Sequence, residues 1–459
     1  MLGERQRKGS GVVIDLTQRP GVVKLAVGVD AGSTETRVAL ADYSDVSVFR
    51  SGTDMNRVLS ILTQTYKVPS SYANVNDAKE IAPVSPNLED NYDSTIVMLS
   101  NGAEKPLLSK HRVIRGRKIN DAMGAVVRYL DSSTNKSDNI IFYTNIIDGI
   151  GYAILQKFNG NIPQKVEVHL SLSVRPKELN NLCRKKMTDN LVGSFMFIWG
   201  GINIEIKIKH IDFTTEPEAQ IQGTTTVYDI RSAVGDNPEH YQKMADSLYD
   251  SNCYIHIEGG GSSIGVEVIK NGDIIDAASQ TFPLGGNYLA QMFIDRYREH
   301  TGRAVTKEAA NKAIVECVLR DGKNLQDVGE LVAECKNQVG MDILERVRHE
   351  VIDLMSELIL SDVEFITLGG RLFASDEVGT TIGEYFEQYL HQISPNTEVY
   401  NLSENFIAQG NLINCVNDES FDYFINKSDK QQAESFPTKQ GTDSGSQVPD
   451  EKQDDVSVD

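Results

Sequence analysis

The sequence has few cysteines, and none is placed where thiol chemistry would hold a fold together. The five are scattered, and no pair of them forms a CxxC motif or a ligand-spaced cluster with histidine. This pattern argues against a disulfide framework and a structural zinc site, and it is typical of a reducing compartment. The cysteines are Cys183, Cys253, Cys317, Cys335 and Cys415.

Long apolar runs and an excess of positive charge are also missing. No stretch approaches the ~20 consecutive apolar residues of a membrane-spanning helix, and residues 1–20 lack the apolar run of a signal peptide. The formal net charge is −20, so direct binding to the phosphate backbone of nucleic acid is not expected. We expect a cytoplasmic protein without membrane contact, which would serve DNA only through an adaptor protein.

The composition divides the chain into a large folded region and two polar ends. At 459 residues it is long enough for several domains. Residues 1–20 are predicted to form a flexible arm. Residues 427–459 have almost no apolar side chains, so we expect a disordered acidic tail, either solubilising or partner-binding. Residues 52–125 are rich in turn residues and indicate an inserted, smaller subdomain.

A short basic run covers residues 110–118, with Lys110, Arg112, Arg115, Arg117 and Lys118. Such a run is usually a solvated loop, and a contact with an adaptor or a second subunit is the alternative. The sequence does not decide between these two interpretations.

Two similar patterns of a strand, an acidic residue, a glycine-serine turn and a return strand indicate an internal duplication. The first has predicted strands at residues 22–29 and 36–41, and the second at 253–257 and 264–269. An α/β fold of two related halves is therefore predicted.

Further elements fill in the two halves. Strands are predicted at 166–174, 202–211 and 363–368, and an amphipathic helix at 341–359. Pro217 indicates the start of another helix, with Thr215 or Glu216 just ahead of it. We place the first domain at 21–215 and the second at 216–426.

The turn after the first strand, DAGST, has the properties of a phosphate-binding loop. Gly32 allows close approach of the backbone, and the hydroxyls of Ser33 and Thr34 add donors. Asp30 would repel phosphate but could hold Mg²⁺ through water. By itself, a tight β-turn explains the motif equally well.

The turn of the second half, EGGGSS, follows the same logic. Three consecutive glycines, Gly259, Gly260 and Gly261, carry a large conformational-entropy cost, and a backbone-lined anion site that includes Ser262 would account for them. A crowded hairpin is the alternative. Glu258 would face the metal from this side.

A third motif, Gly369-Gly370-Arg371, follows the last predicted strand. Two glycines at a strand end would admit a ribose or a flat ring, and Arg371 could stack on adenine. A simple turn from strand to helix explains the motif equally well when it is taken alone.

Taken in order, VGVDAGSTETRVAL, HIEGGGSSIGVEVI and FITLGGRLF resemble the two phosphate loops and the adenosine segment of the actin/heat-shock-chaperone/hexokinase ATPase superfamily. The resemblance covers residues 22–425 and is nearest to bacterial actin-like proteins of the plasmid-segregating ParM type. It implies two actin-like (ribonuclease H-like) domains around a central nucleotide cleft, with ATP and Mg²⁺ as ligands.

Site residues carried over by the resemblance come from two further segments. Glu216 of TTEPEAQ would be catalytic by orienting the attacking water, although an acid favoured at a helix N-terminus explains it too. Gly285 of FPLGGNYLAQ would support the phosphates. The superfamily usually has aspartate where this chain has Glu258, so its metal role, through water, is less secure than that of Asp30.

The function implied by the resemblance is an ATP hydrolase that assembles head to tail into filaments and segregates plasmid or other DNA through an adaptor. Two other functions stay open on the same scaffold. One is a small-molecule kinase or phosphatase, for which no acceptor-site base is evident. The other is an ATP-switched binding protein.

Overall fold

The computed structural model describes residues 17–418, except 34, 75–91, 116–125, 129, 131–134, 272, 276–277, 322–323, 354–362, 374–379 and 403–404. The expected tail at 427–459 lies outside the described residues. Of the expected N-terminal arm, residues 1–16 also lie outside, whereas the first strand already begins at Gln18.

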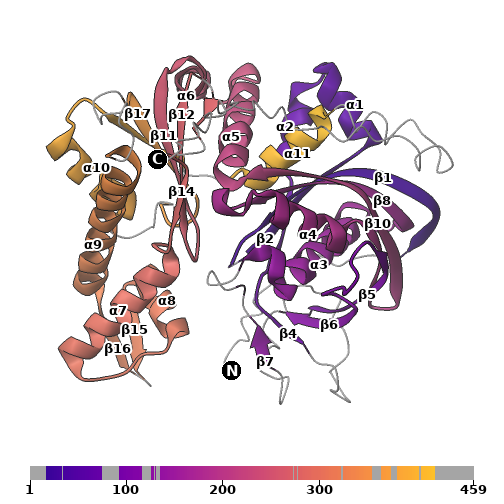
Figure 1. Cartoon of the computed structure of the whole chain (residues 1–459), viewed down its shortest axis with the longest axis horizontal. Coiled ribbons are helices and arrows are strands. Elements are labelled where there is room, and N and C mark those ends of the chain that lie inside the picture. The colour runs from indigo at the N-terminus through magenta and orange to yellow at the C-terminus, as the bar shows by residue number, and fades with distance from the viewer. Residues whose placement is uncertain are drawn as a thin grey trace, which may run out of the picture.

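The first half of the chain is built on a large mixed sheet (Figure 1). Strands β1 and β2 form the predicted hairpin, and β8 and β10 add to β1 in parallel. The sheet has the order β3 (Thr65–Pro69), β2 (Glu35–Asp42), β1 (Gln18–Ala31), β8 (Ile162–Val174), β10 (Ile202–Thr215), β9 (Gly193–Trp199), β5 (Tyr92–Asn101), β6 (Lys110–Arg115), β4 (Tyr72–Asn74), β7 (Val126–Arg128).

The second half repeats the central pattern in a smaller sheet. β11 and β12 form an antiparallel hairpin, and β17 and β18 follow β11 in parallel, as β8 and β10 follow β1. The order is β13 (Asp273–Ile274), β12 (Ile264–Lys270), β11 (Cys253–Gly259), β17 (Phe365–Gly369), β18 (Glu398–Asn401), with β14 (Gln280–Phe282) beside β12. The predicted α/β fold of two related halves is confirmed. A separate hairpin joins β15 (Val318–Asp321) to β16 (Asn324–Asp327).

Helices cover both sheets. The described α-helices are α1 (Tyr43–Ser51), α2 (Met55–Thr63), α3 (Ile140–Lys157), α4 (Asn181–Leu191), α5 (Glu216–Ala233), α6 (Pro238–Asp250), α7 (Gly286–Thr301), α8 (Lys307–Glu316), α9 (Gly329–Val347), α10 (Ile382–Ile393) and α11 (Ile407–Asn417). None of the helices in the described ranges is long and apolar enough to cross a bilayer. Of the helix predicted at 341–359, the first part is the end of α9, followed by a π-helical turn at Arg348–Ile352, and residues 354–359 lie outside the described part.

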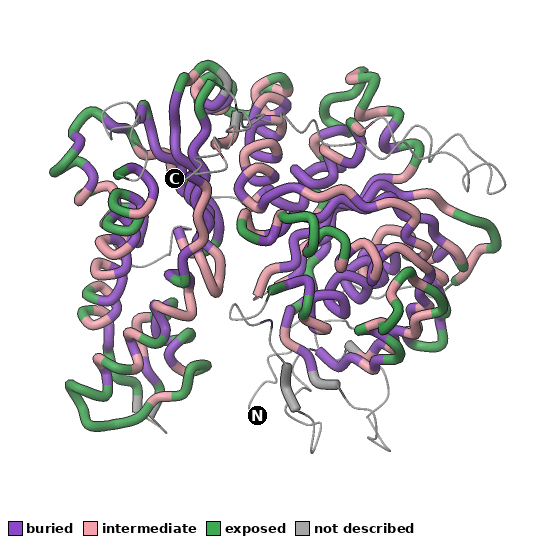
Figure 2. The backbone as a smooth tube through the Cα atoms, in the orientation of Figure 1, coloured by how far each residue is buried: buried purple, intermediate pink, exposed green. Residues whose placement is uncertain are grey.

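Each half has its own apolar core, and both sheets are buried along most of their strands (Figure 2). A third cluster lies between them, where α5 contacts both sheets and α11 packs on β1 and α5. The packing is very close, because a Cβ atom at Gly28 of β1 or Gly410 of α11 would overlap backbone atoms of the facing element. Helix α11, the last helix in the described part of the chain, thus returns to the first half and joins the two.

The segment predicted as an inserted subdomain contributes to the large sheet where it is described. Residues 52–74 and 92–115 form α2 and strands β3 to β6. The basic run is part of this sheet up to Arg115, which is buried and forms an ion pair with Asp148, Nε to Oδ2 2.6 Å. Arg112 pairs with Asp93 at 2.7 Å, so these two arginines are occupied within the protein. Residues 116–118 lie outside the described part.

Candidate functional site

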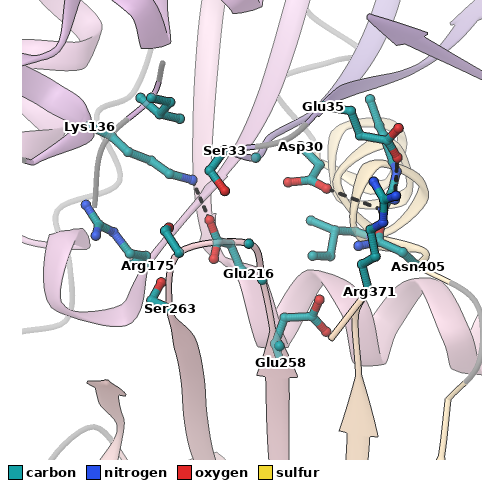
Figure 3. A pocket seen from close by; sticks show the side chains of 18 residues that line it. Asp30, Ser33, Glu35, Lys136, Arg175, Glu216, Glu258, Ser263, Arg371 and Asn405 are labelled. Atoms are coloured by element: carbon teal, nitrogen blue, oxygen red, sulfur yellow. Dashed lines mark hydrogen bonds and ion pairs between the residues drawn. The ribbon is translucent and has the colours of Figure 1, made fainter. Parts of the chain in front are cut away.

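The turns of the two hairpins line a common cavity between the halves (Figure 3). It opens to solvent. Predicted site residues in its wall are Asp30, Gly32, Ser33, Glu216, Glu258, Gly259, Gly260, Gly261, Ser262 and Arg371. Thr34 lies outside the described residues, and Gly285, Gly369 and Gly370 lie outside this wall.

Asp30 lies near the end of β1, where the hydrophobic strand delivers it to the cavity. Its side chain is buried, and burial raises its pKa to about 7. The guanidinium of Arg37, on the paired strand β2, lies 3.8 Å from its carboxylate and opposes this rise. A buried carboxylate with a raised pKa becomes ionised more readily when a cation approaches, as a metal-binding role requires.

The glycine turn of the second half is held by the start of α7. The amides of Gly286 and Asn287 donate to the carbonyl oxygens of Gly260 and Gly261, at 3.1 and 2.6 Å. Gly285 packs directly behind the turn, because a Cβ atom there would overlap the backbone at Ser262–Ser263. Gly285 therefore lies where it supports the turn from outside the cavity. The amide of Gly260 donates within the turn, to the carbonyl of Ser263 at 2.9 Å.

Glu258 occupies a space that two glycines leave open. A Cβ atom on Gly369 would lie 2.5 Å from Oε2 of Glu258, and one on Gly370, at φ +86°, would overlap Oε1. That this glycine pair also admits a ribose stays a prediction. In the structure the pair makes room for the Glu258 carboxylate, which reaches further than an aspartate would.

A histidine lies behind Glu258. Nε2 of His256 is 3.5 Å from Oε2 of Glu258, and Nδ1 lies 2.7 Å from the hydroxyl of Thr367. Burial raises the pKa of Glu258 to about 8 and lowers that of His256 to about 3. Both are therefore neutral at pH 7 while no cation is present. His256 and Glu258 are two positions apart on β11, and this spacing in the sequence indicates that their side chains lie on the same face of the strand.

Glu216 is the first residue of α5 and projects into the cavity. Thr215 caps this helix in a capping box with Glu218, so the helix starts one residue before Pro217. The Glu216 carboxylate forms an ion pair with the Lys136 ammonium (Figure 3). The ammonium also lies 5.5 Å from the centre of the Phe142 ring.

Four cavity residues carry positive charge or an amide and were missed in the sequence: Arg37, Lys136, Arg175 and Asn405. Arg37 had a detectable signal, because it alternates with Glu35 on β2 and both side chains face the cavity. Lys136 and Arg175 lie in or beside short helical turns that connect longer elements, and the sequence of these turns has no motif that would indicate a binding site. Arg175 is fixed by Glu178, with Nη2 to Oε1 2.6 Å.

Two further hollows adjoin the cavity, and Arg371 lines all three. One of them, with a volume of about 350 Å³, lies between the glycine turn, α7, α8 and α9. Its apolar side chains include Leu289, Ile314 and Ile382. Polar groups come from Asn287, Asn311 and Lys336. An apolar wall with a few polar groups suits a flat heterocycle. The other hollow includes Gly370 and Glu35.

Comparison with solved structures identifies the fold. The archaeal actin homologue Ta0583 superposes with a TM-score of 0.55 and 12% identity, covering 85% of this chain and 98% of that one. A pCBH ParM described as a non-polymerisable quadruple mutant superposes with a TM-score of 0.54 and 12% identity, covering 86% of this chain and 98% of that one. Bacillus thuringiensis ParM with ATP superposes with a TM-score of 0.50 and 12% identity, again covering 86% of this chain and 98% of that one. No protein-family model and no curated protein matches the sequence.

The chain therefore has the actin-like two-domain fold, as its three motifs indicate, and it is structurally similar to ParM proteins. At 12% identity the likeness concerns the fold. The roles of the cavity residues depend on the geometry described above.

Proposed function

We propose that the protein binds ATP with Mg²⁺ in the cavity between its halves and hydrolyses it. The observation that carries this proposal is the meeting of two glycine-serine turns, one from each half, with buried carboxylates and basic side chains around a single cavity. Backbone-lined turns of this kind bind phosphate oxygens. The ADP complex of Ta0583 and the ATP complex of the B. thuringiensis ParM support the assignment of an adenine nucleotide.

The phosphates would lie between Gly32–Ser33 and Gly261–Ser262, with Lys136 and Arg175 near enough to the same cavity to neutralise charge. Asp30 and Glu258 would hold the water shell of Mg²⁺, which supplies screening of the phosphate charge. Asp30 and Glu258 suit this role because both carboxyl groups are buried in the wall of the cavity. Two buried carboxyl groups with raised pKa values, which release their remaining protons as a cation arrives, would favour the metal–nucleotide complex over either ligand alone.

The adenosine would lie toward Arg371, in the hollow bounded by the glycine turn and helices α7 to α9. Arg371 lines both the phosphate cavity and this hollow, as Gly260 and Gly261 also do, so its guanidinium can stack on the base while the phosphates stay at the turns. Gly369 and Gly370 act indirectly, by leaving room for Glu258.

Glu216 would position the attacking water. Its carboxylate is part of the cavity wall and is held by the Lys136 ammonium, which fixes its direction. Loss of the γ-phosphate would remove contacts with the turns and change the angle between the halves. This change would pass through α5, which begins at Glu216 and contacts both sheets.

Nucleotide-dependent assembly is the biological role that we propose, with head-to-tail filaments that move plasmid or other DNA through an adaptor in the cytoplasm. The similarity to the pCBH ParM, whose solved form is a mutant made non-polymerisable, supports self-association as a property to test. A head-to-tail contact generates a filament when its rotation does not close into a ring.

Two assays on the same preparation test this function. Phosphate release measures hydrolysis, and light scattering with electron microscopy measures assembly, each with ATP, ADP or no nucleotide. We expect phosphate release with ATP and filaments that need it. Turnover of a sugar or polyphosphate without filaments would instead support a small-molecule enzyme.

A further inference from the structure

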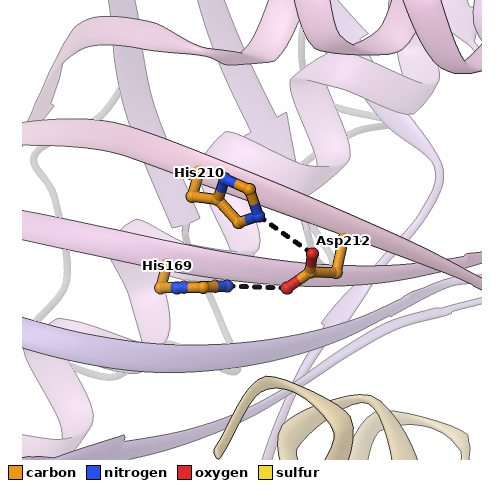
Figure 4. A group of neighbouring side chains, drawn as sticks. All are labelled: His169, His210 and Asp212. Atoms are coloured by element: carbon orange, nitrogen blue, oxygen red, sulfur yellow. Dashed lines mark hydrogen bonds and ion pairs between the residues drawn. The ribbon is translucent and has the colours of Figure 1, made fainter. Parts of the chain in front are cut away.

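Two histidines and an aspartate form a cluster on the large sheet, away from the nucleotide cavity (Figure 4). Nε2 of His169 on β8 lies 2.6 Å from Oδ2 of Asp212 on β10, and Nε2 of His210 lies 2.9 Å from Oδ1. His169 is level with Ala26 of β1, four residues before Asp30. At ~3.3 Å per residue this places the cluster about 13 Å along the strand from the cavity.

A β-bulge brings His210 into the cluster. Ile208 pairs with Val168 and His210 pairs with His169, so Lys209 is an extra residue in β10. The sequence records the same shift, because the buried isoleucines fall at alternate positions up to Ile208 and then at Ile211. Without the extra residue, lysine would stand opposite His169. The bulge turns a second imidazole to the face of the sheet that carries the first.

We propose that His169, His210 and Asp212 bind a first-row divalent metal ion, with Zn²⁺ as the expected ion. One ligand atom from each of the three residues lies within 4.8 Å of the other two, so a small closure of the side chains places an ion among them. Imidazole nitrogens with one carboxylate suit zinc and its neighbours, whereas Mg²⁺ and Ca²⁺ prefer oxygen ligands alone.

The burial of the three residues fits an open metal site. The His169 side chain is fully buried, which fixes one ligand, while His210 and Asp212 are 28% and 26% exposed. Solvent therefore reaches one side of the cluster, where an ion can enter and keep a water molecule as a further ligand. Sheet strands on both sides make the ligand backbone rigid.

Without metal, the Asp212 carboxylate bridges the two Nε2 atoms by hydrogen bonds. Metal binding would replace these bonds, and each neutral imidazole would carry its proton on Nδ1 instead of Nε2. The competing explanation is a hydrogen-bonded trio that only stiffens the bulge. The two explanations differ in one respect, because only the first predicts tight and stoichiometric binding of zinc.

Calorimetric titration of the full chain with ZnCl₂ in excess Mg²⁺ tests the proposal, since Mg²⁺ occupies carboxylate sites without competing for imidazole. We expect one Zn²⁺ per chain, and at least about 10-fold weaker binding in His210→Ala and in Asp212→Asn. The matched control is His349→Ala, which removes an exposed histidine–aspartate pair, Nδ1 to Oδ2 2.9 Å, that has no third ligand in the described region.

Thermal melting by circular dichroism shows whether the variants fold. Zn²⁺ should raise the melting temperature of the wild-type protein and of His349→Ala, and should leave that of folded His210→Ala unchanged. The proposal is overturned if the wild type takes up no Zn²⁺, or if His210→Ala and Asp212→Asn bind it as tightly as the wild type. Nucleotide binding is a separate readout and does not affect this result.

Discussion

The carboxylate of Glu216 and the ammonium of Lys136 form an ion pair in the wall of the cavity, although 80 positions separate the two residues. Lys136 approaches from the short helical turn before α3, and Glu216 from the first residue of α5. The pair fixes the one candidate catalytic side chain that the sequence offers, and its consequences can be tested by substitution.

Glu216→Gln should keep nucleotide binding and slow hydrolysis by about 100-fold or more, because an amide keeps the shape of the side chain but cannot act as a base toward water. Phosphate release under single-turnover conditions measures the effect. Glu239→Gln, at an exposed position of α6, is the matched control and should hydrolyse ATP as the wild type does. Equal rates in all three proteins would remove Glu216 from the mechanism.

Gly369→Ala should destabilise the protein by about 1–3 kcal/mol, since its Cβ atom would lie 2.5 Å from the Glu258 carboxylate. Glu258→Asp shortens that side chain and should recover part of the loss in the double variant. Denaturant unfolding of the wild type, the two single variants and the double variant gives the coupling free energy between positions 369 and 258. Gly102→Ala, whose Cβ atom would meet nothing closer than 3.7 Å, serves as the control. If the two substitutions change the free energy of unfolding additively, position 369 and the Glu258 side chain are not in contact.

Stability in the absence of nucleotide should fall as the pH rises from about 6.5 to 8. Burial raises the pKa of Asp30 to about 7 and of Glu258 to about 8, so the folded state holds protons that the unfolded state has released. His256, with its pKa lowered to about 3, has the opposite effect, but only below its unfolded pKa of about 6.5. Chemical unfolding at several pH values measures this slope.

Glu258→Gln isolates one contribution to that slope. The amide does not titrate, so the fall between pH 6.5 and 8 should become shallower than in the wild type. A slope that is unchanged in this variant would mean that Glu258 ionises in the folded protein as readily as in the unfolded chain.

Arg371→Ala should weaken ATP binding by about 10-fold, as expected for a lost cation–π contact and lost charge in a partly desolvated site. Fluorescence of a labelled ATP analogue measures the affinity. Arg303→Ala, in the connection after α7, is the matched control and should bind as the wild type does. Stronger loss of affinity for inorganic triphosphate than for ATP would place Arg371 at the phosphates instead of the base.

The sequence predicted the parts of this structure that depend on local pattern. Each hairpin has a short apolar strand on either side of a glycine-serine turn, and Asp30 and Glu258 each lie at the end of a buried run, so both turns could be located from the chain alone. The start of α5 was predictable to within one residue from Thr215 and Pro217. The strands β8 and β17 were also predicted, but their parallel pairing with β1 and β11 was not.

Other features depend on distant partners and could not be read from the sequence. Lys136 reaches Glu216 across the fold, and the glycines at 369–370 serve a side chain from another strand. The return of α11 to β1 also depends on the match between Gly28 and the helix backbone. The bulge at Lys209 coincides with a break in the alternation of apolar residues. Its effect, which is to place His210 beside His169, depends on the neighbouring strand β8.

The most direct test of the nucleotide site is calorimetric titration of the pure, folded protein with ATP, in Mg²⁺ and again in excess EDTA. We expect binding of one ATP per chain that weakens when Mg²⁺ is removed, and weakens again in Asp30→Asn. If no ATP binds in the presence of Mg²⁺, or if binding is the same with EDTA, two facing turns with buried carboxylates do not form a metal–nucleotide site.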